Sequence, residues 1–445
     1  MTSKNVPPTI DRRKFLELAT LASGAVVVST LPGCQSRETK ETSKRTVASA
    51  GFSSEGLARV RTAMTGYVDR GAMPGLITVL SRGDELHIEP IGMKAVGGTE
   101  PMRRDTIFRI ASMTKPITAA ATLLLVEDGR IRLEDPVDRL LPELANRRVL
   151  RRPNGALDDT VPAARPITVR DLLTFTMGLG LVFPVENYPI LARAVELDVM
   201  EIPPRPQTPP APDEWMRRLG TLPLMHQPGE RWVYNTGSDV LGVLIARASG
   251  QPFETFLHER LFQPLGMKDT GFSIAAEKVN RLTPVYWANA KTKALEVFDG
   301  APDTAYARPP AFPSGAGGLL STADDFLVFA RMLLNKGEHG GARIMSTQSI
   351  EMMTRDQLTP EQKRDAGLFP EFFATSGWGY GVSVVTGPDE VSATPGRYGW
   401  FGGFGTYWYS DPTRDLVGLL LTPRVFDEVS PAQDFWKAVY QALEA

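Results

Sequence analysis

The chain has 445 residues, of which 42% are apolar and 22% are charged, and its formal net charge is −2. This composition predicts a folded globular protein with a large core and excludes a disordered chain. The small net charge, without any long run of lysine and arginine, argues against a nucleic-acid partner and against general attraction to an anionic membrane.

The N-terminal segment is predicted to be an export signal. Arg12 and Arg13 precede an apolar stretch that ends in small residues before Cys34, which is the layout of a secretory signal over residues 1–33. The stretch is shorter than the roughly 20 residues that a membrane span needs. "RRKFL" resembles a twin-arginine signal and "LPGC" a bacterial lipobox, so we expect an exported protein, periplasmic or anchored by lipid on Cys34, with residues 34–50 as a flexible tether. The alternative is ordinary signal cleavage without lipidation. Because Cys34 is the one cysteine of the chain, an intrachain disulfide and a cysteine-based metal site are both excluded.

A helix and a hairpin are predicted next. Apolar residues at helical spacing follow Ser53, a residue type that favours N-caps, and Gly71 marks the end of the helix. The following stretch, "GLITVLSRGDELHIEPIGM", has two extended apolar runs separated by Arg82-Gly83-Asp84. This pattern predicts a β-hairpin.

The rest of the chain predicts a helical middle and a second set of strands. Helical periodicity recurs in "ITAAATLLLVEDG", "TVRDLLTFTMG" and "SDVLGVLIARASG", whereas extended patterns return at "YGVSVVTG", "TYWYSDP" and "DLVGLLLTP" before a closing amphipathic helix. Strands at both ends suggest one sheet built from both ends of residues 51–445. A mostly helical lobe, roughly residues 116–310, is inserted between the sheet-forming segments.

One segment is too rich in proline for a regular element. Residues 183–223 contain "EIPPRPQTPPAPDEW", which predicts a stiff loop. A long irregular loop in a compact domain is commonly a lid or a binding wall, and a surface ornament is the alternative.

The apolar run "FRIASMTKPITAAATLLLVEDG" keeps polar residues at its front edge. If Ser112 lies at the start of a helix, Lys115 stands beside it one turn later. Pro116 fits a first helical turn, where its missing N–H costs little. A partly desolvated lysine with a lowered pKa can take the proton of a serine hydroxyl and make it a nucleophile. The pattern Ser-x-x-Lys alone arises by chance, and an N-cap serine with a solvated lysine is the alternative.

Five segments, in this order along the chain, resemble the serine β-lactamase-like superfamily: "FRIASMTK", "LEDPVDRLLPEL", "ITVRDLLTFTMGL", "QPGERWVYNTGSDVLGVLIARASGQPFETFLHERLFQPLGMKDTGF" and "SGAGGLLSTADDFLVFARMLLN". That superfamily includes class C β-lactamases, D-Ala-D-Ala carboxypeptidases and family VIII carboxylesterases. The resemblance implies an α/β (α+β) fold of the β-lactamase/transpeptidase type: an antiparallel sheet sandwiched by N- and C-terminal helices, with the site between the sheet and the helical lobe.

The resemblance also implies roles for individual residues. Ser112 matches the nucleophile, Lys115 its activating partner and Tyr234 the second-motif tyrosine, which can return a proton to the leaving group. The third motif falls at "YGWFGGFGT", where the N–H of Gly403 and that of Ser112 would form the oxyanion hole.

Two departures from the pattern favour an ester substrate. Trp400, Phe401 and Gly402 stand where the family has Lys-Thr-Gly or His-x-Gly, and an indole offers no charge to a substrate carboxylate. The second motif has Asn235 and Thr236 where Tyr-x-Asn is usual. These residues, in the expected substrate site, resemble family VIII carboxylesterases, so we expect a serine hydrolase acting on small or apolar esters, with no cofactor.

Other functions remain as alternatives. A β-lactamase or D-Ala-D-Ala carboxypeptidase would use the same residues, and a non-catalytic receptor for cell-wall peptides or β-lactams would keep the cleft alone. No Gly-x-Ser-x-Gly elbow occurs, and the four histidines are scattered singly without a His-Glu-x-x-His motif. We therefore expect neither an α/β-hydrolase arrangement nor a metal.

Overall fold

The computed structural model describes residues 51–443 apart from 202, 365 and 367–370. The predicted signal, tether and lipidation site at Cys34 lie outside the described residues. Among the residues described, no helix has the length and apolar character needed to cross a membrane.

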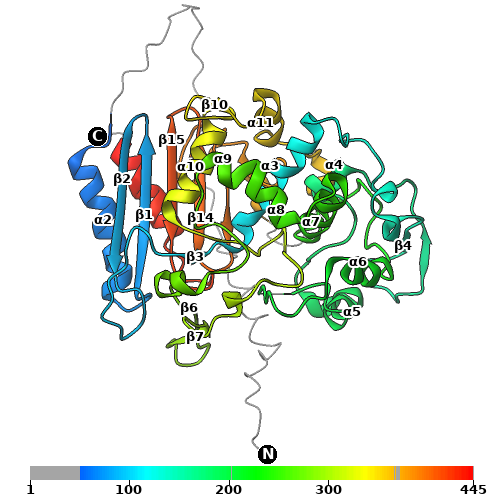
Figure 1. Cartoon of the computed structure of the whole chain (residues 1–445), viewed down its shortest axis with the longest axis horizontal. Helices are drawn as coiled ribbons and strands as arrows, with labels where there is room; N and C mark the ends of the chain where they lie inside the picture. Colours follow the sequence, from blue (N-terminus) through cyan, green and yellow to red (C-terminus); the bar gives the residue numbers. More distant parts are fainter. Residues whose placement is uncertain (1–50, 202, 365, 367–370, 444–445) are drawn as a thin grey trace, which may run out of the picture.

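A seven-stranded antiparallel sheet is built from both ends of the described chain (Figure 1). Its order is β11-β12-β13-β14-β15-β1-β2, so the first strand pairs with the last, with Ile77 opposite Leu421. Every sequence-adjacent pair of these strands is antiparallel, as short connections allow. The strands are β1 (Gly75–Arg82), β2 (Glu85–Gly92), β11 (Ser376–Trp378), β12 (Ser383–Val385), β13 (Tyr398–Gly402), β14 (Thr406–Asp411) and β15 (Leu416–Leu421).

The two terminal helices pack together on one face of this sheet (Figure 1). Helix α2 (Ser54–Asp69) begins after Ser53, whose side chain accepts a hydrogen bond from the Gly56 amide as a cap should. Helix α14 (Ala432–Leu443) buries one apolar side against α2 and the sheet. The predicted first helix, closing helix and hairpin turn are confirmed.

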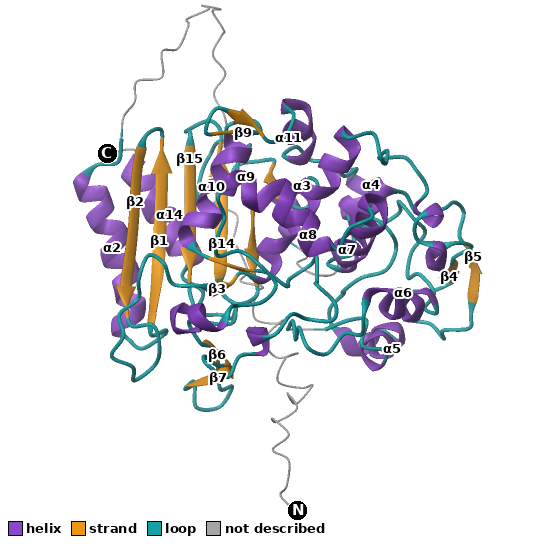
Figure 2. Cartoon of the chain, viewed as in Figure 1, coloured by secondary structure: helices purple, strands orange, loops and turns teal. Residues whose placement is uncertain are grey.

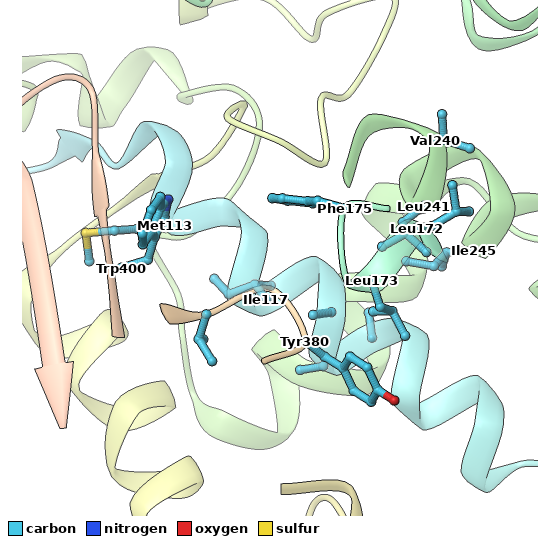
Figure 3. Packing of buried hydrophobic residues seen from close by; sticks show 14 of the residues in the cluster. Met113, Ile117, Leu172, Leu173, Phe175, Val240, Leu241, Ile245, Tyr380 and Trp400 are labelled. Carbon is cyan, nitrogen blue, oxygen red and sulfur yellow. The ribbon is translucent and has the colours of Figure 1, made fainter. Parts of the chain in front are cut away.

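The helical lobe lies on the other face of the sheet (Figure 2). Helix α3 (Thr114–Glu127) runs between the sheet and α7 (Thr236–Ser249), and nearly all of its residues are buried. Figure 3 shows the two sides of this packing: Met113, just before α3, lies beside Trp400 of the sheet, and Leu241 and Ile245 of α7 lie on the other side of α3. A helix covered on both sides has little need of a polar face.

Short elements complete the lobe. Its further helices are α4 (Val169–Leu173), α5 (Pro189–Glu196), α6 (Pro212–Gly220), α8 (Phe253–Leu257), α9 (Gln263–Leu265), α10 (Ala323–Leu334), α11 (Thr347–Met353), α12 (Pro360–Lys363) and α13 (Phe372–Thr375). Paired short strands are β3 (Phe108–Arg109) with β8 (Leu320–Ser321), β4 (Arg148–Leu150) with β5 (Thr160–Pro162), β6 (Val285–Ala288) with β7 (Leu295–Asp299), and β9 (Glu338–His339) with β10 (Ala342–Arg343).

The proline-rich segment corrects one prediction. The structure breaks the expected stiff loop into α5, an irregular stretch and α6, because Pro189 and Pro212 each begin a helix instead of preventing one. A proline in the first helical position loses no hydrogen bond that the helix would have made. The stretch between the two helices remains irregular where it is described, and a 3-10 turn (Val185–Asn187) precedes α5.

Candidate active site

Ser112 lies in a single 3-10 turn (Ala111–Met113) that continues directly into α3. Ala111 has a φ of +43°, in the left-handed region that non-glycine residues rarely adopt, at a cost of about 1–3 kcal/mol. Such strain is characteristic of functional sites, and here it falls on the residue before the predicted nucleophile. The turn presents the Ser112 amide at the start of a helix, where backbone N–H groups have no partner within the helix.

Lys115 is completely buried one turn beyond Ser112. Its Nζ lies 2.9 Å from the Ser112 Oγ and donates a hydrogen bond to the Ala316 carbonyl oxygen at 2.7 Å. Burial lowers the pKa of Lys115 to about 7, although the Asp239 charge acts in the opposite direction. A neutral amine within hydrogen-bond reach of a serine hydroxyl can act as its general base.

Asp239 supports Lys115 from behind, a role that the sequence analysis missed. Its carboxylate accepts hydrogen bonds from the Ser314 hydroxyl at 2.6 Å and the Ala316 amide at 3.1 Å. It therefore fixes the segment whose carbonyl binds Lys115. The sequence offers one indication of this role: Asp239 lies in the predicted helix "SDVLGVLIARASG", five residues after Tyr234.

Tyr234 stands opposite Lys115, just before α7. The Lys115 Nζ lies 4.6 Å from the centre of its ring, and Asn235, the next residue, has a φ of +84°. Burial raises the pKa of the Tyr234 hydroxyl, against hydrogen bonds to Ser112 and Trp400 that lower it. A tyrosine that keeps its proton is suited to act as the acid, and Lys115 to act as the base.

Trp400 requires a correction, because it lies behind the cavity and not in its wall. Its side chain is 0% exposed and belongs to the main core. Its indole N–H donates a hydrogen bond to the Tyr234 hydroxyl at 2.8 Å. The expected direct contact with substrate is therefore replaced by a contact with Tyr234, and the neighbouring Phe401 lines the cavity.

The glycines of the third motif bring β13 close to the nucleophile. A Cβ on Gly402 would lie 2.2 Å from the Ile110 carbonyl oxygen, so only glycine fits there. Gly403 lines the cavity, and within the described part of the chain its amide donates no hydrogen bond. The amides of Gly403 and Ser112 are therefore available as an oxyanion hole.

Ser112, Tyr234 and Gly403 meet in one cavity of about 230 Å³. Asn235 also lines it, whereas Thr236 is buried in the first turn of α7 and does not. The remaining wall is largely apolar and aromatic and includes Trp215, Phe312, Phe401 and Phe426, together with Pro203, Pro204, Pro206 and Pro209 of the irregular stretch between α5 and α6.

The proline segment lies close to the turn that carries Ser112. A Cβ on Gly317 would meet Pro204 at 3.2 Å and the carbonyl carbon of Ala111 at 3.8 Å. Gln207 fastens the segment through hydrogen bonds from its side-chain amide to the carbonyl oxygens of Ala305 and Arg308. The segment thus forms part of the cavity wall, as the sequence predicts. Within the described ranges, no group of three or more His, Cys, Asp or Glu side chains could hold a metal ion.

We predict that Trp400→Phe lowers kcat three- to tenfold with little change in KM, because it removes one hydrogen bond to Tyr234, worth about 0.5–1.5 kcal/mol. Steady-state kinetics on an aryl ester measures both constants. Trp408→Phe is the matched control: Trp408 is also 0% exposed and pairs with Trp400 across β13 and β14, but its indole N–H binds Ser410. Equal losses of kcat in both variants would assign the effect to packing.

Comparison with known proteins agrees with this geometry. A family model described as "Beta-lactamase" matches residues 60–442. Protein Rv1367c of Mycobacterium tuberculosis is 40% identical over 79% of this chain and 86% of its own length. Esterase EstB of Burkholderia gladioli is 32% identical over 80% of this chain and 87% of its own. The solved structure of EstCE1, a hydrolase with promiscuous acyltransferase activity, has the same fold, with a TM-score of 0.69 and 24% identity over 87% of this chain and 99% of its own.

Proposed function

The chain belongs to the beta-lactamase family and is a serine hydrolase, and from this premise we propose that it is a carboxylesterase acting on small or apolar esters. One observation carries the proposal: the third-motif indole binds Tyr234, in the position where the family pattern has a cation for a substrate carboxylate. The similarity to EstB, an esterase, agrees with it.

The proposed reaction uses five groups of this chain. Neutral Lys115 takes the proton of the Ser112 hydroxyl while Oγ attacks the ester carbonyl. The amides of Ser112 and Gly403 bind the resulting oxyanion. Tyr234, held by Trp400, gives its proton to the departing alkoxide, and Lys115 returns a proton to Tyr234. Water then attacks the acyl-enzyme with the same groups, releasing the acid and restoring Ser112.

The test compares two substrates. We predict turnover of a p-nitrophenyl short-chain ester, with kcat/KM for a chromogenic cephalosporin lower by at least roughly tenfold, because a charged hydrogen bond to the β-lactam carboxylate is worth about 1.5–3 kcal/mol. Faster hydrolysis of the cephalosporin would instead identify a β-lactamase. Stoichiometric acylation without turnover of either substrate would identify a receptor.

We also propose that the protein is exported and lipidated on Cys34. The support is the sequence alone, "RRKFL" followed by "LPGC". The expected result is partition of the mature protein into detergent, and its release into the soluble fraction by Cys34→Ser. A mature N-terminus at any residue other than Cys34, determined by mass spectrometry, would contradict lipidation.

A further inference from the structure

The wall between α5 and α6 gives the cavity an excess of negative charge. Three carboxyl residues line the cavity, Asp198, Glu201 and Asp239. The one cationic residue among the cavity-lining residues, Arg205, has an exposed side chain. Because the rest of the wall is largely apolar, these charges are poorly screened.

Glu201 forms no ion pair in the described part of the chain; Asp239 forms none either, but the charge of the buried Lys115 acts on it. Asp198 receives a hydrogen bond from the Arg218 guanidinium at 3.1 Å, and Asp239 is bound by Ser314 and Ala316 as described above. Glu201 accepts a hydrogen bond from the Arg205 backbone amide at 2.8 Å. In the described part of the chain, no lysine, arginine or histidine nitrogen lies within 4.0 Å of its oxygens.

The Tyr306 hydroxyl is a second polar group of the cavity without a hydrogen bond in the part of the chain that is described, although the Arg109 guanidinium lies 5.4 Å from the centre of its ring. Tyr306 lines the same cavity and is 1% exposed, and its hydroxyl has no hydrogen-bond partner among the described residues. Burial raises the pKa of the Tyr306 hydroxyl, the Arg109 charge opposes this, and the charges of Asp299 and Glu201 act in the same direction as burial. The rings of Trp215 and Phe312 stack 4.7 Å apart in the same wall.

From these contacts we propose that the cavity selects esters that carry a positively charged group, and that Glu201 is the specificity-determining residue. A carboxylate in an apolar cavity is costly to leave without a counter-ion, and a substrate cation supplies one. Aromatic faces and the Tyr306 oxygen add the contacts that an ammonium group prefers. The same charge repels substrates with a carboxylate. This inference rests on the proposed esterase activity for its substrate class.

The charge on Glu201 varies near neutral pH. Burial raises the pKa of its carboxyl to about 7, against hydrogen bonds from Arg205 and Thr208 and the Arg205 charge, while Asp198 acts in the same direction as burial. The charge of Lys115, whose pKa burial also lowers to about 7, is lost over the same pH range and acts equally in the parent and in Glu201→Gln. The ratio of kcat/KM for a cationic ester to that for a neutral ester should therefore rise with pH through about 7 in the parent, and by less in Glu201→Gln.

The test uses three p-nitrophenyl esters of equal acyl length, ending in methyl, ammonium or carboxylate. In the parent we expect kcat/KM at least about tenfold higher for the ammonium ester than for the neutral ester, and at least about tenfold lower for the carboxylate ester. In Glu201→Gln, which keeps an oxygen for the Arg205 amide, both ratios should fall to within about threefold of one.

Two controls distinguish the role proposed for Glu201 from the esterase activity on which it rests. Glu196→Gln, at an exposed position on α5, makes the same change in net charge and should alter neither ratio. Binding of butylammonium and butanoate, measured by NMR titration, needs no turnover and should differ at least tenfold in the parent and not in Glu201→Gln. Ester turnover without charge preference overturns the role of Glu201 alone. Charge-selective binding without turnover of any ester contradicts the proposed esterase activity and still supports the proposed cation site.

Discussion

Replacing Ser112 by alanine is expected to lower kcat by a factor on the order of 10⁴ to 10⁶, the range for removing the nucleophile of a serine hydrolase. The reason is that the Ser112 hydroxyl is the one that the buried Lys115 can deprotonate: the Lys115 Nζ lies 2.9 Å from the Ser112 Oγ and also binds the Ala316 carbonyl. Hydrolysis of a p-nitrophenyl ester measures the loss. Mass spectrometry of the parent treated with a fluorophosphonate should place a single adduct on Ser112.

The alanine variant should keep its fold, because only one oxygen is removed. Equal thermal unfolding of parent and variant is the control for that assumption. An adduct on a residue other than Ser112, or undiminished turnover in the variant, would show that the nucleophile has been misassigned.

Replacing Lys115 by arginine is expected to lower kcat/KM by a factor on the order of 10³ to 10⁴, near the upper end of what general-base catalysis contributes. The lysine can lose its proton at neutral pH because burial lowers its pKa to about 7, whereas a guanidinium keeps its proton. In the parent, kcat/KM should therefore fall as the pH drops through about 7. The pH profile of the parent and the activity of the variant check the two halves of this prediction.

A second variant at position 115 tests whether Lys115→Arg is inactive because it unfolds. Arginine introduces a fixed charge at a position with 0% exposure, and a buried unpaired charge can unfold a protein. Lys115→Met keeps the length of the side chain without the charge, so it should fold and be equally inactive. Recovery of more than a tenth of the parent activity by arginine would contradict the base role, and so would an active methionine variant.

The sequence predicts elements whose cause is local. Ser53 caps α2 and the residues Arg82-Gly83-Asp84 turn the first hairpin, because capping and turn chemistry depend on a few neighbouring residues. Ser112 and Lys115 are close for the same reason, since their spacing is one helical turn. Tyr234 and Gly403 come from distant segments, and only the resemblance to a known family predicts that they join Ser112.

The side chains that the sequence misjudged depend on long-range packing. Trp400 and Phe401 were both expected to touch substrate, yet adjacent residues of a strand point to opposite faces, so only one can face the cavity. Trp400 shares the core with Trp408, its partner on the neighbouring strand β14, and Phe401 lines the cavity. Glu201 lies in a stretch without helical or strand periodicity, so the sequence does not predict which way its side chain points.

The pairing of β1 with β15 has a consequence for how the protein acquires its active site. Hydrogen bonds between the first and last strands of the sheet close a loop of more than three hundred residues, and such closure is slow because its entropy must be lost before the contacts form. Gly403 reaches Ser112 only on strands that are synthesised after the whole helical lobe. A nascent chain that ends before Gly403 therefore lacks one of the two amides proposed for the oxyanion hole, and the active site can be completed only after the helical lobe has been synthesised.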